Sequence, residues 1–355
     1  MVDGLVDSGS IRTSRVEAAF RSIPRHLFVP DADPELVYAG EAIPIEHGED
    51  GLPISSSSEP AIMATMLEQL SLSSGHNVLE VGTGSGYNAA LLGAILGEGG
   101  RVRTIDLDEA LVERAQQLLR SASSANVLAA ARDGWFGFSE DAPYDRIEVT
   151  VGVWDISPDW VDQLAGNGIL VVPLWLRAGV QASIAFRHDG SDLVSVSVAP
   201  CGFMRLRGPH AGPETYVPVQ GWVLCDDATD PAQRDATLRL LRSAPTISEA
   251  PSLPRQWFTR VALSHPSPVR LLSTSEPWLH REGILLPDGS GLAMTEGERI
   301  LTFGDPTARD ELVRVASASE GELEHVIIRA HRAGDRPDRT ETPLLRPAFS
   351  YSFEW

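Results

Sequence analysis

The sequence contains no lysine, and all 29 of its positively charged side chains are arginine. A lysine Schiff base and a phosphate-binding P-loop both require a lysine amine, so both are excluded. Cysteine is almost as scarce, with Cys201 and Cys225 alone and no CxxC pair. A disulfide framework or a cysteine-rich zinc site needs more thiols than this, so we expect both cysteines to pack as small apolar side chains.

Long apolar runs are also missing. No stretch approaches the roughly 18 residues that a membrane-spanning helix needs. The segment MVDGLVDSGS at the start lacks the basic and apolar regions of a signal peptide, so we expect a soluble, cytoplasmic protein. The net charge of −20 opposes binding to nucleic acid and to anionic membranes, and neither is expected as a partner.

The sequence lacks the motifs of two common kinds of catalytic centre, metal sites and serine hydrolases. The nine histidines follow neither an HxxxH spacing nor a cysteine–histidine cluster, so no metal site is expected. The GxSxG elbow of serine hydrolases does not occur either, which disfavours that class of enzyme.

The sequence does contain a regular alternation of strand and helix patterns, in which apolar runs such as NVLEV and ILVVPLWL alternate with stretches such as EALVERAQQLLRSA. This alternation predicts an α/β fold with a parallel sheet and helices on both faces. We expect a first domain over residues 1–212, in which residues 31–57 are loop-like. A second, α+β module is expected over residues 213–355, in which GPETYVPVQGWVLCDD forms one strand.

A glycine-rich turn follows one buried strand, in VLEVGTGSGYNAALL. Gly82, Gly84 and Gly86 allow the backbone to approach a ligand, and the next helix offers free N–H groups. Asp106 ends the following strand, where an acid can bind ribose hydroxyls, and Asp133 follows the third strand. The pattern predicts a nucleoside cofactor. Because it is G-x-G-x-G rather than G-x-G-x-x-G, a nicotinamide is less well supported, and a ligand-free turn stays an alternative.

Four consecutive serines, Ser55 to Ser58, precede Glu59 and a helix expected over residues 60–71. A serine beside a helix start is typical of an N-cap, and a run of serines is typical of a solvated linker. The same hydroxyls would also suit one wall of an active site. The pattern by itself leaves these alternatives open.

Several segments, taken in order, resemble the protein-L-isoaspartate (D-aspartate) O-methyltransferase family, which uses S-adenosylmethionine (SAM). They are IPRHLFVP, VYAGEAIPI, SSSSEPAIMA, VLEVGTGSGYNAALL, DGWFGFSEDAPYDRIEVT and LAGNGILVVP, and they extend over roughly residues 11–200. SSSSEPAIMA is similar to the stretch usually written T-I-S-Q-P or T-I-S-A-P, which places the family's active-site serine on Ser58. The combination of motifs is specific, although the glycine-rich turn alone is not.

The resemblance implies a Rossmann-like SAM-dependent methyltransferase sheet with a C-terminal α+β extension. It also implies a reaction in which an aspartate or isoaspartate carboxylate of a peptide becomes a methyl ester. Ser58 would orient that carboxylate, and the substrate contacts implied for this chain are Ser57, Ser58, Glu59 and Trp154.

For the cofactor, the resemblance implies that the glycine turn faces the methionine part of SAM. Asp106 would then bind the ribose and Asp133 the adenine. The implied cofactor residues are Glu80, Gly82, Thr83, Gly84, Gly86, Asp106, Leu107, Asp133 and Gly134.

Three features depart from the family pattern. Glu59 stands where the family usually has Gln or Ala, VGVWDISPDW replaces a stretch of small residues, and the chain is well over a hundred residues longer than the repair enzymes. Longer relatives that resemble this chain occur together with ribosomally made peptides. They esterify one aspartate of such a peptide, and the ester then closes to an aspartimide (succinimide). We therefore expect a tailoring enzyme for such a peptide, with general isoaspartyl repair as the alternative.

Two other classes of protein fit the glycine-rich turn. A binding protein that keeps the SAM pocket without turnover would bind SAM and never transfer its methyl group. A nicotinamide oxidoreductase would bind NAD instead. In the leading interpretation, residues 213–355 recognise or clamp the peptide.

Overall fold

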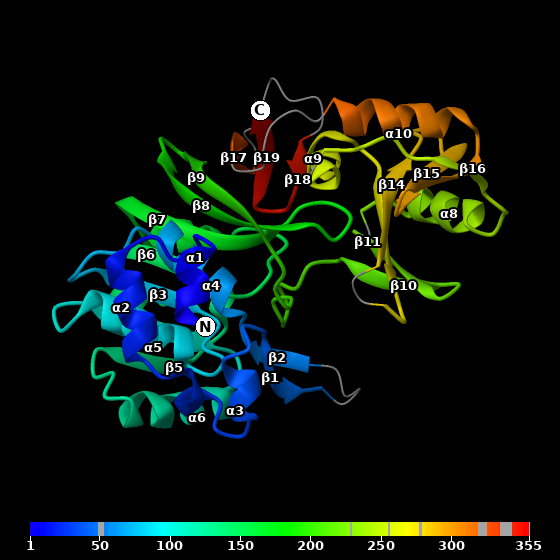
Figure 1. Ribbon diagram of the computed structural model, residues 1–355. Helices are drawn as coiled ribbons and strands as arrows, with labels where there is room; N and C mark the ends of the chain where they lie inside the picture. Colours follow the sequence, from blue (N-terminus) through cyan, green and yellow to red (C-terminus); the bar gives the residue numbers. More distant parts are fainter. Residues whose placement is uncertain are drawn as a thin grey trace. The chain divides into compact units, whose positions relative to one another are not determined.

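The computed structural model describes residues 1–48, 53–227, 229–254, 256–276, 279–318, 325–333 and 343–354 of the 355-residue chain (Figure 1). The chain divides into two compact units. Unit 1 consists of residues 1–174 and 182–211, and unit 2 consists of residues 175–181 and 212–355.

A sheet with a parallel centre organises unit 1. Its parallel strands are β3 (Asn77–Val81), β4 (Arg101–Asp106), β5 (Val127–Ala131), β6 (Tyr144–Val149) and β7 (Leu164–Trp175), in the order β5-β4-β3-β6-β7. β8 (Gln181–Asp189) and β9 (Asp192–Cys201) follow β7 in the sheet and are connected by a short turn. The predicted α/β fold with a parallel, Rossmann-like sheet is confirmed.

Unit 1 also contains helices. They are α1 (Val2–Asp7), α2 (Ser14–Ser22), α3 (Pro34–Val37), α4 (Pro60–Gln69), α5 (Tyr87–Leu96), α6 (Glu109–Ser121) and α7 (Pro158–Gln163), with the short 3-10 helices η1 (Arg25–Phe28), η2 (Gly134–Phe136) and η3 (Ser139–Asp141). Of these, α5 and α6 contact the parallel strands. Figure 1 shows α1, α2, α4 and α5 grouped together, and one hydrophobic core joins Phe20 of α2, Leu67 of α4 and Leu91 of α5 to the strands. This core fixes the starts of α4 and α5 relative to the sheet edge.

Apart from residues 49–52, which lie outside the described residues, the interval 31–57 is not the loop that the sequence predicts. It contains α3, and β1 (Ile43–His47) pairs antiparallel with β2 (Pro53–Ser57) in a separate two-stranded sheet. Both strands carry proline, which a two-stranded ribbon accepts because each strand has a free edge. The two strands also show only weak alternation of apolar and polar residues, so the local sequence pattern did not reveal them.

Unit 2 is built on a seven-stranded sheet whose paired strands run antiparallel. The order is β10 (Thr215–Val219), β11 (Trp222–Asp226), β13 (Pro268–Ser273), β14 (His280–Leu285), β15 (Gly291–Glu296), β16 (Arg299–Gly304) and β12 (Thr246–Glu249). Its helices are α8 (Pro231–Leu240), α9 (Trp257–Ser264) and α10 (Thr307–Ser317). Three further strands, β17 (Ile327–Arg332), β18 (Leu344–Leu345) and β19 (Phe349–Glu354), pair antiparallel with one another through β19.

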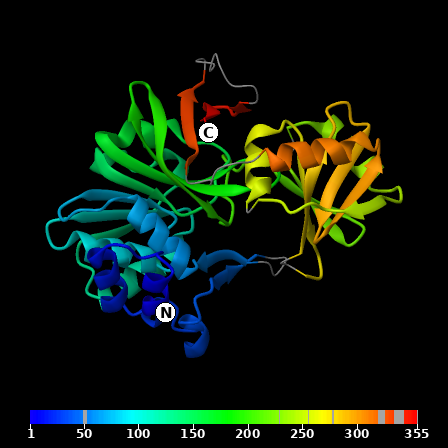
Figure 2. The same cartoon turned by 45° about the horizontal axis from the view of Figure 1, so that its top comes forward.

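Helices α8 and α10 pack on this sheet from opposite faces. Leu292 and Met294 of β15 share a hydrophobic core with Ala236 of α8. Gly291 of the same strand faces the other way, because a Cβ placed there would lie 3.1 Å from the Cβ of Ala308 on α10. Figure 2 shows α10, in orange, lying across the strands.

The segment GPETYVPVQGWVLCDD forms two strands rather than the one that the sequence predicts. β10 and β11 are joined at Gln220 and Gly221, which have φ of +47° and +81°. Positive φ at both positions is the conformation of a two-residue hairpin turn. Gln occupies a position that usually holds Asn, Asp or Gly, so the turn lacked its usual sequence signal.

Arginines connect residues 175–181 to the rest of unit 2. Arg346 donates to the carbonyl of Leu176 at 2.8 Å, and Arg177 donates to the carbonyls of Ala262, Leu263 and Pro343. The N–H of Ala178 also donates to Asp227 Oδ2, so side-chain hydrogen bonds attach this segment to the rest of unit 2.

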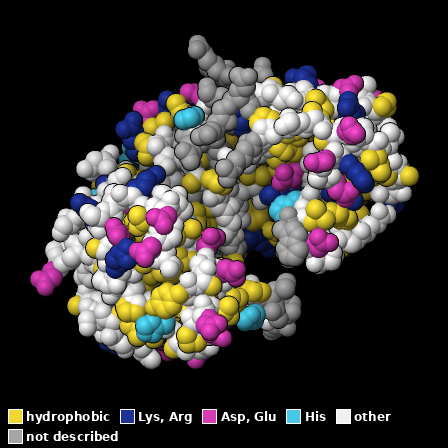
Figure 3. Space-filling model, in the orientation of Figure 1, with side chains coloured by type: hydrophobic (Ala, Val, Ile, Leu, Met, Phe, Trp, Pro, Cys, Tyr) yellow, Lys and Arg dark blue, Asp and Glu magenta, His cyan; other side chains and the backbone are white. Residues whose placement is uncertain are grey.

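Within the described residues, no helix is long and apolar enough to cross a membrane. On the face seen in Figure 3, Asp and Glu side chains are spread among Arg and apolar side chains and do not gather in one place.

Candidate active site

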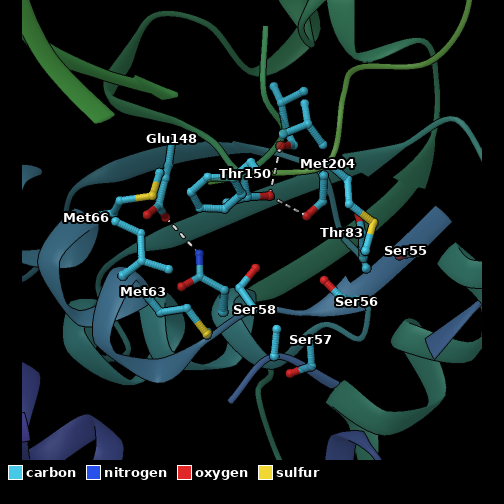
Figure 4. Close-up of a pocket in the computed structure, with 18 of the residues that line it drawn as sticks. Ser55, Ser56, Ser57, Ser58, Met63, Met66, Thr83, Glu148, Thr150 and Met204 are labelled. Carbon is cyan, nitrogen blue, oxygen red and sulfur yellow. Dashed lines mark hydrogen bonds between the residues drawn. The ribbon is translucent and has the colours of Figure 1, made fainter. Parts of the chain in front are cut away.

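A cavity of about 650 Å³ lies in unit 1, lined by the carboxyl ends of β3 and β4 and by the start of α4. Two sets of lining residues matter for the argument: residues 82–84, 106–107 and 133–134, here called the glycine wall, and residues 54–59, here called the serine wall. Figure 4 shows the labelled serines of the second set across from Thr83 and Thr150, with Met63, Met66 and Glu148 at one side.

The glycine wall depends on backbone conformations that glycine adopts readily. Gly82 has φ of +107° and Gly84 has φ of +50°. A Cβ on Gly82 would lie 2.5 Å from Thr150 Oγ1, an impossible distance. That hydroxyl donates to the carbonyls of Val81 and Gly82, as the dashed lines in Figure 4 indicate, so it is held against the turn. The backbone itself therefore faces the cavity.

Two acids complete the glycine wall. Asp106 Oδ2 accepts from the N–H of Gly84 at 3.1 Å and Oδ1 accepts from the N–H of Asp108 at 3.2 Å. Asp133 Oδ1 accepts from the N–H of Trp135 at 3.0 Å and so caps η2. Backbone amides thus fix both carboxylates, and each retains lone pairs for hydroxyl or amine donors of a ligand.

The serine wall comprises residues 54–57 of β2 and the two residues that join this strand to α4. Ser57 is 3% exposed, and its Oγ has no hydrogen-bond partner among the described residues. The N-cap of α4 is Glu59, whose side chain makes no capping bond, and Pro60 opens the helix. The serine run therefore lies largely on a strand and supplies no N-cap, so neither the linker nor the N-cap alternative describes it.

A row of polar side chains crosses the sheet beside the cavity. Thr104, Glu80 and Glu148 are neighbours on adjacent strands. Asn88 Nδ2 donates to Glu80 Oε1 and to Glu148 Oε2, both at 2.8 Å, and Thr104 Oγ1 donates to Glu80 Oε2. Burial raises the pKa of Glu80 to about 7, and burial together with the nearby Glu80 raises the pKa of Glu148 to about 8. Glu148 lines the cavity, so the cavity surface includes a carboxyl group that retains its proton near neutral pH.

The structure brings most of the predicted site residues together. Those that line the cavity are Ser57, Ser58, Glu59, Gly82, Thr83, Gly84, Asp106, Leu107, Asp133 and Gly134.

Three predicted residues do not line the cavity. Glu80 is fully buried, and both of its carboxylate oxygens are bonded inside the protein. A Cβ on Gly86 would lie 3.2 Å from that of Ala115, so this glycine permits close packing of α5 on α6. Trp154, predicted to contact the substrate, is only 7% exposed and belongs to the buried core.

Sequence reasoning missed several lining residues. Glu148 carried a signal, since an acid inside the apolar strand pattern RIEVT is unusual for a parallel sheet. Met63, Met66 and residues 200–207 carried none, because apolar spacing on a helix and a segment after a hairpin look the same with or without a ligand. Within the described part of the chain, no group of His, Cys, Asp or Glu side chains is arranged to hold a metal ion.

Comparison with known proteins identifies the family. The sequence model of protein-L-isoaspartate(D-aspartate) O-methyltransferase (PCMT) matches residues 1–208. The chain belongs to this family. It is 38% identical over 211 residues to protein-L-isoaspartate O-methyltransferase 2 of Shewanella sediminis, which covers 59% of this chain and 82% of that protein. It is 40% identical over 210 residues to the protein-L-isoaspartate O-methyltransferase of Dictyoglomus thermophilum, covering 59% and 90%.

A solved structure of a protein-L-isoaspartate O-methyltransferase resembles the fold of both units of this PCMT-family chain. It has a TM-score of 0.56 and 24% sequence identity, and the match covers 92% of this chain and 94% of that one. At this identity the likeness concerns the fold alone. The fold beyond the family-matched residues 1–208 is therefore shared with at least one protein of that name.

The chain is a SAM-dependent methyltransferase of this family, and its residues fit the cofactor. The cavity has a volume in the usual range for cofactor sites. An exposed glycine backbone, an acid at the end of β4 and an acid after β5 meet at one sheet edge, where folds of this type bind nucleosides.

Proposed function

We propose that this enzyme esterifies a free carboxylate in a peptide or protein: the α-carboxylate of an isoaspartyl residue or the side-chain carboxylate of an aspartyl residue. The proposal rests on the observation that the glycine wall and the serine wall line the same cavity. A cofactor and a peptide carboxylate bound to these walls would be direct neighbours.

The acceptor needs no general base. A carboxylic acid has an ordinary pKa of about 4, so the acceptor is already ionised near neutral pH. The serine wall therefore serves to align the acceptor. Holding two reactants in the correct geometry lowers a reaction barrier by roughly 7–11 kcal/mol. Ser58 Oγ would donate to one carboxylate oxygen and leave the other directed at the methyl group.

The glycine wall would hold the cofactor. Gly82, Thr83 and Gly84 would contact its methionine part, Asp106 the ribose hydroxyls and Asp133 the adenine amine. When bound, SAM supplies a methyl group that its positive sulfonium makes electrophilic. The apolar side chains Met63 and Met66, together with Val81, would keep water from the acceptor, so that opposite charges combine in dry surroundings.

The methyl ester is expected to react further without help from the enzyme. The backbone nitrogen of the next residue attacks the ester carbonyl, a C–N bond forms, and the C–O bond to the methoxy group breaks. Methanol leaves with the amide proton, and a succinimide remains. Hydrolysis of that ring gives aspartate or isoaspartate, which is the chemistry of repair.

Two biological uses of this reaction are candidates. Our finer proposal is tailoring of a ribosomally made peptide to an aspartimide, supported by Glu59, an exposed acid lining the cavity where the family usually has Gln or Ala. General isoaspartyl repair is the alternative. Chain length does not separate them, because a solved protein-L-isoaspartate O-methyltransferase matches 92% of this chain.

Intact-mass analysis of a short isoaspartyl peptide and its aspartyl twin, each incubated with SAM and the enzyme, tests the proposal. A gain of one methylene mass on the isoaspartyl peptide, followed by loss of methanol, supports methyl transfer with the broad recognition that repair needs. A gain only on the peptide encoded beside the gene supports tailoring. Intact SAM binding without a mass gain on any of these peptides contradicts the proposed reaction.

We also propose that unit 2 contributes to peptide recognition. Hydrogen exchange of the full chain, with and without a reactive peptide, tests this. Slower exchange within residues 213–355 on peptide binding is the expected result. Protection confined to residues 1–211 would contradict it.

A further inference from the structure

Arg25, on η1, is entirely buried although it carries a guanidinium group. It donates to four backbone carbonyls from three segments. Nη1 donates to Val37 O at 2.9 Å, and Nη2 lies 3.0 Å from Glu41 O, 3.2 Å from Ser57 O and 3.0 Å from Ser58 O. One side chain thus connects the end of α3, the segment before β1 and the serine wall.

No carboxylate pairs with Arg25 in the part of the chain that the structure describes. Burial lowers the pKa of its guanidinium, but an arginine remains charged at any ordinary pH. A buried cation without an anionic partner is costly, and here only carbonyl dipoles compensate it. Such an arrangement leaves a positive potential behind the serine wall.

The bonds to Ser57 and Ser58 also fix which way their peptide groups point. In a trans peptide the carbonyl of one residue and the N–H of the next point in opposite directions. Since the carbonyls of Ser57 and Ser58 point at Arg25, the N–H groups of Ser58 and Glu59 point away from it. Among the described residues neither N–H has an acceptor, and both residues line the cavity.

We infer that Arg25 is a positioning residue for the acceptor: its guanidinium holds the carbonyls of Ser57 and Ser58 away from the cavity, so that the amides of Ser58 and Glu59 face the carboxylate of the peptide. This rests on the proposed function. The glycine wall has no bond to Arg25, so the effect is confined to the acceptor and does not extend to SAM.

Substitution of Arg25 tests this assignment. Arg25→Lys keeps the charge but cannot reach three segments, and Arg25→Met removes both charge and donors. Arg146→Met is the control, because Arg146 is partly buried and likewise donates to backbone carbonyls. Its acceptors are Leu70, Asp145 and Ser71, and none of them lines the cavity. The readouts are thermal midpoint, SAM affinity by calorimetry, and kcat and KM for the isoaspartyl peptide.

Both Arg25 variants are expected to lose at least about 30-fold in kcat/KM for the peptide, a loss typical of removing charge-assisted hydrogen bonds. Their SAM affinity is expected to change less than about threefold. Arg146→Met is expected to lower the thermal midpoint and leave both kinetic constants nearly unchanged. Equal losses of peptide and SAM binding in the Arg25 variants would overturn the inference, and so would kinetics like those of the control.

Hydrogen exchange of the unchanged protein keeps the inference testable if the Arg25 variants do not fold. The amides of Ser58 and Glu59 should exchange fast in the free enzyme and slow at least tenfold when S-adenosylhomocysteine and the isoaspartyl peptide are both bound. Fast exchange of these amides in that complex would overturn the inference. This arm needs no turnover, so its failure in an enzyme that methylates the peptide is distinct from failure of the proposed reaction.

Discussion

The glycine wall and the serine wall face one cavity but are built in different ways. Gly82, Gly84 and Asp106 are set by their own strand ends and by hydrogen bonds between close neighbours in the fold. The serine wall is held from outside, by an arginine more than thirty positions earlier in the chain. The cofactor side is thus a local motif that sequence reveals, and the acceptor side is a tertiary construction that it does not.

The largest expected effect comes from a change in the glycine wall, which should weaken cofactor binding. Gly82→Ala would place a Cβ 2.5 Å from Thr150 Oγ1 at φ of +107°. The turn must move, so we expect SAM affinity measured by calorimetry to fall about 100-fold or more. Gly166→Ala is the control, since Gly166 has open space around it and no positive φ. Unchanged SAM affinity in Gly82→Ala would show that this backbone does not form the cofactor site.

Ser58→Ala is the corresponding change on the serine wall. Loss of one orienting hydroxyl is expected to lower kcat for the peptide about 10- to 100-fold, with SAM affinity unchanged. Ser56→Ala, on the same wall, is the control and should retain nearly full activity. If the two variants lose activity equally, Ser58 has no special role in the acceptor site.

The buried carboxyl pair predicts a pH dependence of stability. The pKa of Glu148 is raised to about 8 in the folded state, above the ordinary value of 4.5, so the folded protein holds a proton that the unfolded chain has released. Stability should therefore fall as pH rises between about 5 and 8. In Glu148→Gln the fall should be smaller by ~1–3 kcal/mol, because Gln cannot ionise but still accepts from Asn88.

Urea denaturation of the two proteins at several pH values measures this difference. Glu59→Gln serves as the control, since it makes the same substitution at an exposed position. Parallel stability profiles for Glu148→Gln and the unchanged protein would show that Glu148 is ionised throughout.

The smallest effect concerns Glu59 and the peptide. Its exposed carboxylate lines the cavity beside the acceptor position and should repel an anionic substrate weakly. Glu59→Gln is expected to lower KM for an acidic isoaspartyl peptide about two- to threefold at low salt and to have little effect at high salt. A KM that does not depend on this substitution at low salt would mean that the peptide approaches from another side.

Sequence reasoning was strongest where chemistry and local backbone coincide. Gly82, Gly84, Asp106 and Asp133 lie at strand ends, and the topology of a parallel sheet brings such ends together. The same pattern did not reveal that Gly86 packs helices.

Long-range features were out of reach of local patterns. Nothing in IPRHLFVP shows that Arg25 reaches the serine run, since this depends on α3 and β1 folding around it. Trp154 was misplaced because a tryptophan in a loop-like stretch looks the same whether it lines a groove or fills a core, and here it is buried.

A crystal structure of the enzyme with S-adenosylhomocysteine and an isoaspartyl peptide tests the central claim most directly. The account predicts adenosine against Asp106 and Asp133, and the isoaspartyl carboxylate hydrogen-bonded to Ser58 Oγ and to the amides of Ser58 and Glu59. A carboxylate bound elsewhere in the cavity, with the serine wall facing solvent, would contradict it.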